Sequence, residues 1–203
     1  MGTKLFLKGE RCFSPKCSMV KKPYPPGVKA KRRRKMSEYN RELREKQKLR
    51  NWYNLQETQF RGYVKEVLKK RGATSKEGET IHAPTLLIQQ LESRLDNMVF
   101  RMGFADSRSQ ARQTVSHGHI LVNGKKVNIP SYQVKIGDKI KIKPSSAKKE
   151  IFKEIESMLK KKDLPSWVSV DIKKLEGKVE NLPSLEDVSP PVEISMIFEF
   201  YSR

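Results

Sequence analysis

A change in the spacing of apolar residues constrains the fold of this chain more than any other feature. Upstream of the change, apolar residues recur at helical intervals along one face: Leu87, Leu91, Leu95, Met98, Val99 and Met102. This spacing predicts an amphipathic helix that ends at Gly103. Ser107 and Gln110 have the spacing of a capping box, which predicts a second helix that ends at Gly118.

From His119 onward the apolar period becomes two, as in a β-strand. Ile120 and Val122 alternate with other residues, and Asn123-Gly124 is a strong signal for a type I′ hairpin turn. Residues 139–143, KIKIK, predict another strand that buries isoleucine on one face and offers lysine on the other. The fold class predicted here is α+β, with two helices packed on a small antiparallel β-sheet.

The charge of the chain indicates the class of its partner. The sequence has 43 Lys and Arg against 23 Asp and Glu, which gives a formal net charge of +20. Residues 1–50 hold 17 basic against 4 acidic residues, residues 51–147 hold 16 against 8, and residues 148–203 hold 10 against 11. Such a field favours a polyanion, with nucleic acid as the first candidate, and the basic contact surface belongs to the first three-quarters of the chain.

Helical patterns outside the central module predict a second, α-helical domain. Residues 37–50 combine a narrow apolar stripe with basic residues on the other faces, and Asn54 and Glu57 have capping-box spacing ahead of another apolar repeat. Residues 148–162 predict a further helix, and Trp167 begins a segment that reads as a strand. The terminal VEISMIFEFYSR fits either a short strand or a helix.

Residues 1–36 form a basic arm that has almost nothing to bury. The run KAKRRRK from Lys29 favours contact with RNA over a solvated tail or a localisation signal, because a second basic module follows downstream. No apolar run is long enough to span a bilayer, no secretory h-region is present, and two cysteines are too few for a disulfide framework. We therefore expect a soluble intracellular protein without a membrane partner.

A series of motifs over nearly the whole chain then identifies a family. In order, they are KGERCFSPKC from Lys8, PYPPG from Pro23, LREKQKLR from Leu43, LESRLDN from Leu91, SRSQARQTVSHGHILVNGKKV from Ser107, PSYQVKIGD from Pro130 and the terminal EFYSR. In this order and spacing the chain resembles the bacterial small-subunit ribosomal protein S-four family. The resemblance implies a flexible basic arm at 1–36, an α-helical domain at 37–90 completed by about 180–203, and an inserted α+β RNA-binding module with its extension at 91–180.

The resemblance also implies a function. Members of the family are structural components of the small ribosomal subunit that bind 16S-type rRNA early in assembly and clamp a helical junction of its 5′ domain. They lie near the path by which messenger RNA enters the subunit and contribute to translational accuracy. The implied partners are small-subunit rRNA, neighbouring proteins of the S-five and S-three families, and the messenger of the protein's own operon. The implied location is the cytoplasmic ribosome, with no small-molecule substrate.

The residues expected to contact RNA are basic groups of the arm and of both domains, together with the turns beside them. They are Lys31, Arg32, Arg33, Arg34, Lys35, Arg44, Lys46, Lys48, Arg50, Arg94, Ser107, Arg108, Arg112, His117, Gly118, His119, Asn123 and Lys125. Arg108 and Arg112, four residues apart, are expected to project outward as forked donors for phosphate. The alternative for His117 and His119 is a structural pair.

Zinc-binding members of the family carry a C-x-x-C pair upstream of the cysteines that correspond to Cys12 and Cys17. These two thiols supply half of a tetrahedral site, so no bound cofactor is expected, zinc included.

Two other functions compete with a ribosomal role. A similar module is appended to RNA-modifying enzymes, and a lone module of this kind serves as a free ribosome-associated RNA-binding factor. No catalytic triad, metal cluster or phosphate-cradling glycine loop is readable in the sequence, which favours a protein without catalytic residues. The helical domain and the terminal segment favour the ribosomal protein over the free factor.

Overall fold

The computed structural model describes residues 3–24, 27, 36–70, 82–153, 155–159 and 163–202. The chain divides into two compact units, which we call the helical unit (Met1–Pro84 and Ser189–Arg203) and the inserted unit (Thr85–Val188). The boundaries predicted from the sequence, at residues 90 and 180, differ from this division. Among the described residues, no helix combines the length and the apolar character needed to cross a membrane.

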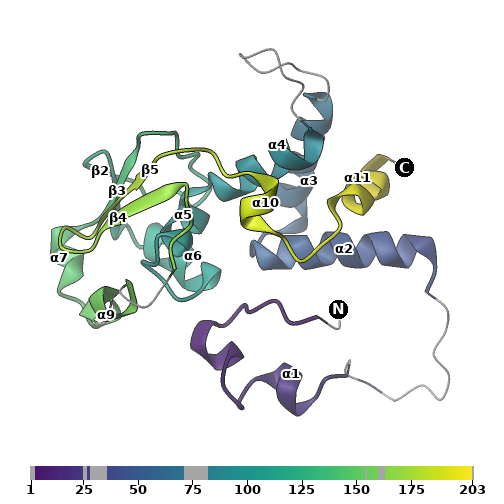
Figure 1. Cartoon of the computed structure of the whole chain (residues 1–203), viewed down its shortest axis with the longest axis horizontal. Helices are drawn as coiled ribbons and strands as arrows, with labels where there is room; N and C mark the ends of the chain where they lie inside the picture. The colour runs from purple at the N-terminus through teal and green to yellow at the C-terminus, as the bar shows by residue number, and fades with distance from the viewer. Residues whose placement is uncertain are drawn as a thin grey trace. The chain divides into compact units, whose positions relative to one another are not determined.

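The helical unit is built from segments at both ends of the chain. Its elements are a 3-10 turn (Gly9–Cys12), α1 (Ser18–Lys21), α2 (Glu38–Trp52), α3 (Glu57–Lys69) and α11 (Ile194–Ser202). The terminal segment, which the sequence left open between strand and helix, forms α11 and packs against α2 and α3 (Figure 1). Leu49, Phe60 and Ile197 are fully buried in this unit. The implied return of the C-terminal segment onto these helices is confirmed.

α2 begins at a side-chain cap, whereas α3 does not begin at the cap predicted from the sequence. The hydroxyl of Ser37 accepts the backbone N–H of Asn40 and caps α2. The predicted cap at Asn54 is wrong: α3 begins after Gln56, and Asn54 lies in the preceding turn with φ +54°. Asn tolerates this left-handed conformation better than most residues, so its role here is to turn the chain.

The inserted unit begins with the helices that were predicted as the core of the module. Its helices are α4 (Ala83–Glu92), α5 (Leu95–Arg101), α6 (Arg108–Ser116), α7 (Pro144–Ala147), α8 (Glu150–Lys153), α9 (Ile155–Leu159) and α10 (Leu185–Val188). The single helix predicted through Met102 is interrupted, because Arg94 is extended (φ −66°, ψ 138°) and separates α4 from α5. Of the helix predicted at 148–162, residues 150–153 and 155–159 are helical.

The strands of the inserted unit form one antiparallel sheet among the described residues. They are β1 (Ile120–Val122), β2 (Lys125–Lys126), β3 (Lys139–Ile142), β4 (Val168–Asp171) and β5 (Glu176–Val179), in the order β2-β1-β3-β5-β4. Asn123 and Gly124 have φ of 49° and 78°, as a type I′ turn requires, so the predicted hairpin is confirmed.

One face of this sheet contributes its side chains to the hydrophobic core of the unit. Ile120 pairs with Ile142 and Val122 with Ile140, and these side chains are buried, while the lysines of β3 alternate away from them. α5 and α6 pack together beside the sheet (Figure 1). At Gly177 in β5 a Cβ would lie 2.5 Å from the sulfur of Met102, the residue after α5, so a larger residue there would require the Met102 side chain to move. The predicted α+β class is confirmed.

Candidate nucleic-acid interface

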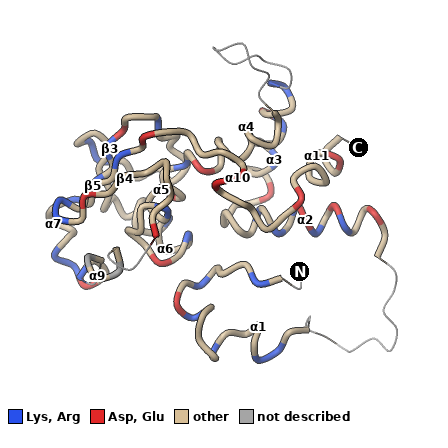
Figure 2. Tube along the Cα trace, viewed as in Figure 1, with Lys and Arg blue, Asp and Glu red and all other residues tan. Residues whose placement is uncertain are grey.

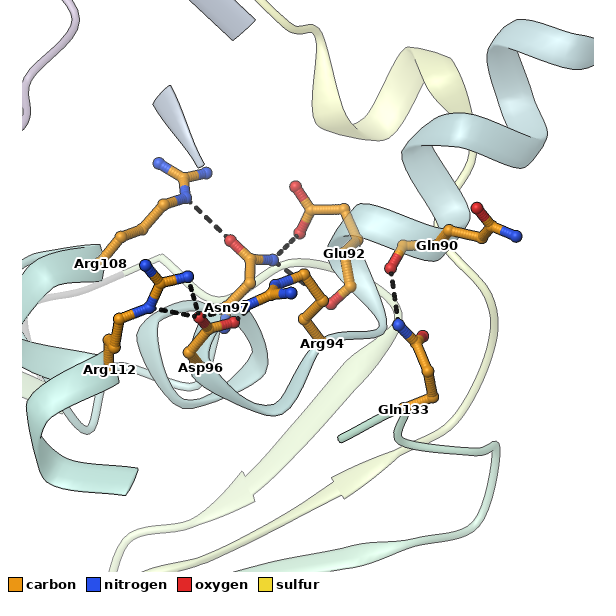
Figure 3. A network of polar contacts seen from close by, with 8 residues as sticks. All are labelled: Gln90, Glu92, Arg94, Asp96, Asn97, Arg108, Arg112 and Gln133. Carbon is orange, nitrogen blue, oxygen red and sulfur yellow. Dashed lines mark hydrogen bonds and ion pairs between the residues drawn. The ribbon is translucent and has the colours of Figure 1, made fainter. Parts of the chain in front are cut away.

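A polar network joins α4, α5 and α6 of the inserted unit (Figure 3). At its centre, Asp96 is 4% exposed and accepts two hydrogen bonds from Arg94, Nε to Oδ1 at 3.0 Å and Nη2 to Oδ2 at 2.7 Å. The side chain of Arg94 is itself 1% exposed. This position does not support the expected RNA contact of Arg94, because its side chain is buried and its charge is paired with Asp96 inside the unit.

Asp96 also holds Arg112, one of the two arginines expected to project from α6. The Nε–H of Arg112 donates to Oδ2 of Asp96 at 3.1 Å, and Nη2 lies 3.1 Å from the same oxygen. The side chain of Arg112 is 26% exposed. Asp96 therefore bridges a buried arginine to one that reaches the surface.

Arg108 is held in a similar way through an amide. Its Nε–H donates to Oδ1 of Asn97 at 2.8 Å, and its guanidinium lies 4.6 Å from the centroid of the Phe100 ring. The amide nitrogen of Asn97 donates in turn to the carboxylate of Glu92, which is fully buried and accepts a forked pair of bonds from Arg101 at 2.9 and 2.7 Å. Arg108 is half-buried. It lies against the unit instead of projecting freely.

These contacts fix the positions of two guanidinium groups on one side of α6. In the described residues the network joins the guanidinium groups of Arg94, Arg101, Arg108 and Arg112 to the carboxylates of Glu92 and Asp96, so it keeps a net positive charge. A guanidinium group that is already hydrogen-bonded to buried acceptors loses little conformational freedom when it binds an anion. The arrangement is suited to binding phosphate oxygens.

The turn between α6 and β1 gives two histidines different exposure, although their ring centroids lie 6.0 Å apart. His117 is exposed, and Gly118 has φ +68°, which ends the helix as predicted. His119 is buried: its Nδ1 lies 3.0 Å from Oγ of Ser146, and its ring packs edge-on against Phe152. Burial lowers the pKa of His119, and nearby positive charges, Lys149 first, lower it further. The predicted RNA contact by His119 is corrected to a neutral structural role, and His117 stays a candidate.

The remaining predicted residues of the inserted unit divide between structure and surface. The hydroxyl of Ser107 accepts the N–H of Gln110 and caps α6, as predicted. The amide of Asn123 donates to Asp138 at 2.8 Å and accepts the backbone N–H of Lys139 at 2.9 Å, so it ties the hairpin tip to a neighbouring turn. Lys125, in β2, is exposed and stays a candidate.

The basic residues expected on α2 do not all face outward. Lys46 is 5% exposed, its Nζ donates to Glu57 at 2.8 Å and lies 4.6 Å from the centroid of the Phe200 ring. The expected RNA contact of Lys46 is not supported by this position, because its side chain is 6% exposed and its charge is paired with Glu57, whose side chain is 40% exposed. Arg44 is exposed, and the half-buried Lys48 pairs with Glu45 one turn away.

Glu57, which the sequence analysis treated only as part of a helix cap, organises this part of the helical unit. It accepts bonds from Lys46, from Arg50 at 3.2 Å and from the hydroxyl of Tyr201 at 2.7 Å. Burial alone would raise the pKa of Glu57, but the hydrogen bonds and the positive charges lower it overall. Burial and the bond to Glu57 raise the pKa of the Tyr201 phenol far above its usual value.

Basic residues also line the surface outside these clusters, along α2 and α3 and around β3 (Figure 2). Lys139 and Lys141 lie 3.8 and 4.0 Å from Glu176 across the strands and are only weakly paired. Lys31, Arg32, Arg33, Arg34 and Lys35 of the arm lie outside the described residues.

Within the described residues, the two cysteines lack the further ligands of a metal site. Cys12 and Cys17 are buried free thiols that interact with each other, and the backbone N–H of Lys8 lies 3.3 Å from the sulfur of Cys12. Among the described residues, no cluster of three or more His, Cys, Asp or Glu is placed to hold a metal ion. The donor set within the described chain does not fit the four ligands of a structural zinc.

The acidic and amide residues that position the arginines were not predicted from the sequence: Glu92, Asp96 and Asn97. A signal for them was present. They lie inside the apolar repeat from Leu87 to Met102, and a polar residue embedded in such a repeat must find a partner where it is buried.

Comparison with known proteins identifies the family of this chain. Residues 93–140 match the S4 domain, and residues 1–82 match the ribosomal protein S4/S9 N-terminal domain. Together these matches define an RNA-binding ribosomal protein. Small ribosomal subunit protein uS4 of Thermus thermophilus is 47% identical over 203 residues, which cover all of this chain and 93% of that protein.

Proteins of the same name from Caldicellulosiruptor saccharolyticus and Halothermothrix orenii are each 48% identical over 202 residues, with 100% of this chain and 93% of each relative covered. The chain therefore belongs to the uS4 family of small ribosomal subunit proteins, and the membership predicted from its motifs is confirmed.

Proposed function

We propose that this protein is a structural, non-catalytic component of the small ribosomal subunit that binds rRNA directly through both of its units. Its family supports this role, as does a net charge of +20, which suits a partner with a dense row of phosphates. The observation that carries the proposal is the pair of guanidinium groups on α6, Arg108 held by Asn97 and Arg112 held by Asp96.

The pair acts as a preformed receptor for phosphate. A guanidinium matches two phosphate oxygens with parallel N–H donors, and a group already immobilised by an internal carboxylate or amide loses less entropy on binding. Exposed Lys125 and His117 lie on the hairpin and at the end of α6 in the same unit, and they extend the basic surface.

The finer proposal concerns the place of the protein in the subunit. We infer that the two units clamp a helical junction in the 5′ domain of 16S-type rRNA, which would stabilise the body of the subunit early in assembly. A junction brings several phosphate backbones together, and basic groups on two units offset their mutual repulsion. On the cytoplasmic ribosome, the protein would contact neighbouring proteins of the S-five and S-three families and contribute to translational accuracy. It would also bind the messenger of its own operon.

A double substitution tests the proposed surface. Arg108→Ala with Arg112→Ala should weaken binding to small-subunit rRNA and lower the slope of log affinity against log salt by roughly 0.7 to 0.9 for each lost phosphate contact. The matched control is Lys173→Ala with Lys174→Ala, which removes the same charge from an exposed turn between β4 and β5. Equal slopes for the two double variants would contradict the proposal.

Sedimentation distinguishes a subunit component from a free factor. The wild-type protein should remain with small subunits through a sucrose gradient at high salt, because contacts from both units must break together before it dissociates. A protein that is released at the salt concentration that frees loosely bound factors would favour the ribosome-associated factor.

A further inference from the structure

Two phenylalanines near the start of the helical unit present their rings to solvent. Phe13 is 75% exposed and Phe6 is 48% exposed, and the rings stack with centroids 5.1 Å apart and an angle of 28° between their planes. Among the described side chains, no other large apolar group is as exposed as Phe13. An exposed aromatic surface of this kind marks a binding site more often than an isolated apolar residue does.

The backbone supports this exposure at a conformational cost. Phe6 has φ +50°, a left-handed conformation that bulky residues rarely adopt. Strained backbone of this kind persists where the surrounding structure imposes it, and it occurs preferentially at ligand-binding positions. Here it lies next to Leu5, whose side chain is buried, so the chain directs Leu5 inward while the ring of Phe6 stays at the surface.

The surroundings of the ring pair are basic. The ammonium of Lys4 lies 5.0 Å from the centroid of the Phe6 ring. A hollow of about 350 Å³ beside Phe6 is lined by Lys4, Lys8 and Arg11, with buried Leu5, Cys12 and Cys17 among its walls. Residues 3–24 carry six Lys or Arg against one Glu. The ligand that fits is flat, has an aromatic face and carries negative charge next to it.

We propose that Phe6 and Phe13 form a stacking platform for an unpaired base of RNA, with the phosphates on either side of that base held by Lys4, Lys8 and Arg11. This rests on the proposed function, since rRNA is the RNA concerned. Aromatic side chains stack on the faces of unpaired bases in many RNA-binding proteins, and neighbouring cations hold the backbone. The positive charge favours RNA over an apolar protein segment as the occupant.

Substitution of Phe13 in the full chain tests the platform. Phe13→Leu keeps an apolar side chain but removes the ring, and it should weaken binding to an in vitro transcript of the 5′ domain of small-subunit rRNA by about 5- to 100-fold. The slope of log affinity against log salt should not change, because no charge is lost. Phe13→Tyr keeps a stacking ring and should bind like the wild type.

Chemical probing of the same complexes locates the base. One unpaired nucleotide protected by the wild type and by Phe13→Tyr should become reactive in the complex with Phe13→Leu. The melting temperature of the protein should be the same for all three, since Phe13 is largely exposed.

Three results would overturn the platform: equal affinity of Phe13→Leu and the wild type, a loss of affinity in Phe13→Tyr as large as in Phe13→Leu, or a lower salt slope in Phe13→Leu. Equal rRNA affinity with weaker retention on intact subunits would point to a protein at this site, and it would also overturn the proposal. If Arg108→Ala with Arg112→Ala still weakens binding while Phe13→Leu does not, the platform fails and the proposed function stands. If the wild type does not bind the transcript, both fail.

Discussion

Substitution of Asp96 by Asn should destabilise the inserted unit more than any change on its surface. Asp96 accepts the two bonds that neutralise the almost fully buried guanidinium of Arg94, and it also binds Arg112. Asn has nearly the same shape and keeps one acceptor oxygen, but it removes the negative charge. The positive charge of Arg94 would then stay in the interior without that carboxylate, at a cost in free energy of unfolding.

The expected size follows from this burial. Loss of one partner from a buried ion pair costs about 3 to 5 kcal/mol, and we take about 3 kcal/mol because Asn retains an acceptor. For a unit of roughly 100 residues this lowers the melting temperature by about 12 to 24 °C. The control is Asp171→Asn, the same chemical change at an exposed ion pair with Lys174, where a loss of about 0 to 1 kcal/mol is expected.

Fluorescence can report on the inserted unit alone. Trp167 is 3% exposed and lies in this unit, while Trp52 lies in the helical unit, so a Trp52→Phe background isolates the signal of interest. Thermal unfolding is then followed for Asp96→Asn and Asp171→Asn. If the two variants melt within a few degrees of each other, the buried ion pair does not stabilise the unit in the way argued above.

Two further predictions concern Glu57 and the cysteines. Because the folded state lowers the pKa of Glu57 below its ordinary 4.5, its contribution to stability is present above that value and is lost as the pH falls through the folded pKa. Melting temperatures can be measured by Trp52 fluorescence in a Trp167→Phe background. As the pH is lowered below about 5, the melting temperature should fall less steeply in Glu57→Gln than in the wild type. Parallel curves of melting temperature against pH would refute this. We also expect well below one zinc per chain by elemental analysis, because Cys12 and Cys17 complete only half of a tetrahedral site. A stoichiometric zinc signal that disappears in Cys12→Ser would show the opposite.

The elements that could be predicted from the sequence are those determined by local chemistry. The hairpin follows from Asn123 and Gly124, which accept positive φ, and α6 follows from the cap at Ser107 and the stop at Gly118. β5 could not be predicted, since a glycine weakens a strand pattern, and the close approach of the Met102 side chain to Gly177 is visible only in the structure.

The interruption between α4 and α5 depends on residues far along the chain. The backbone N–H groups of Leu95 and Asp96 donate to the carbonyls of Tyr132 and Pro130, and Val134 donates to Ser93. These bonds satisfy the first turn of α5 without α4, whereas the apolar repeat runs through the break unchanged. No pattern within residues 85–103 contains this information.

The sequence indicated that the candidate site consists of basic residues, but it did not indicate which of their side chains are exposed. Lys46 was expected at the surface because Lys usually is, and His119 because it follows the basic helix, yet each is buried beside a partner outside its own segment, Glu57 and Ser146. The expectation that Arg108 and Arg112 contact RNA stays a prediction, and the internal acceptors that hold them, Asn97 and Asp96, could not be read from their spacing.

The helical unit has a consequence for the order of synthesis. α2 and α3 are made before the inserted unit and α11 after it, and the hydroxyl of Tyr201 bonds to Glu57 across 144 positions of sequence. The inserted unit is continuous in sequence. During translation it can therefore fold before α11 of the helical unit has been synthesised. A polypeptide released between residues 188 and 194 would therefore carry a complete S4 domain and a helical unit that lacks α11.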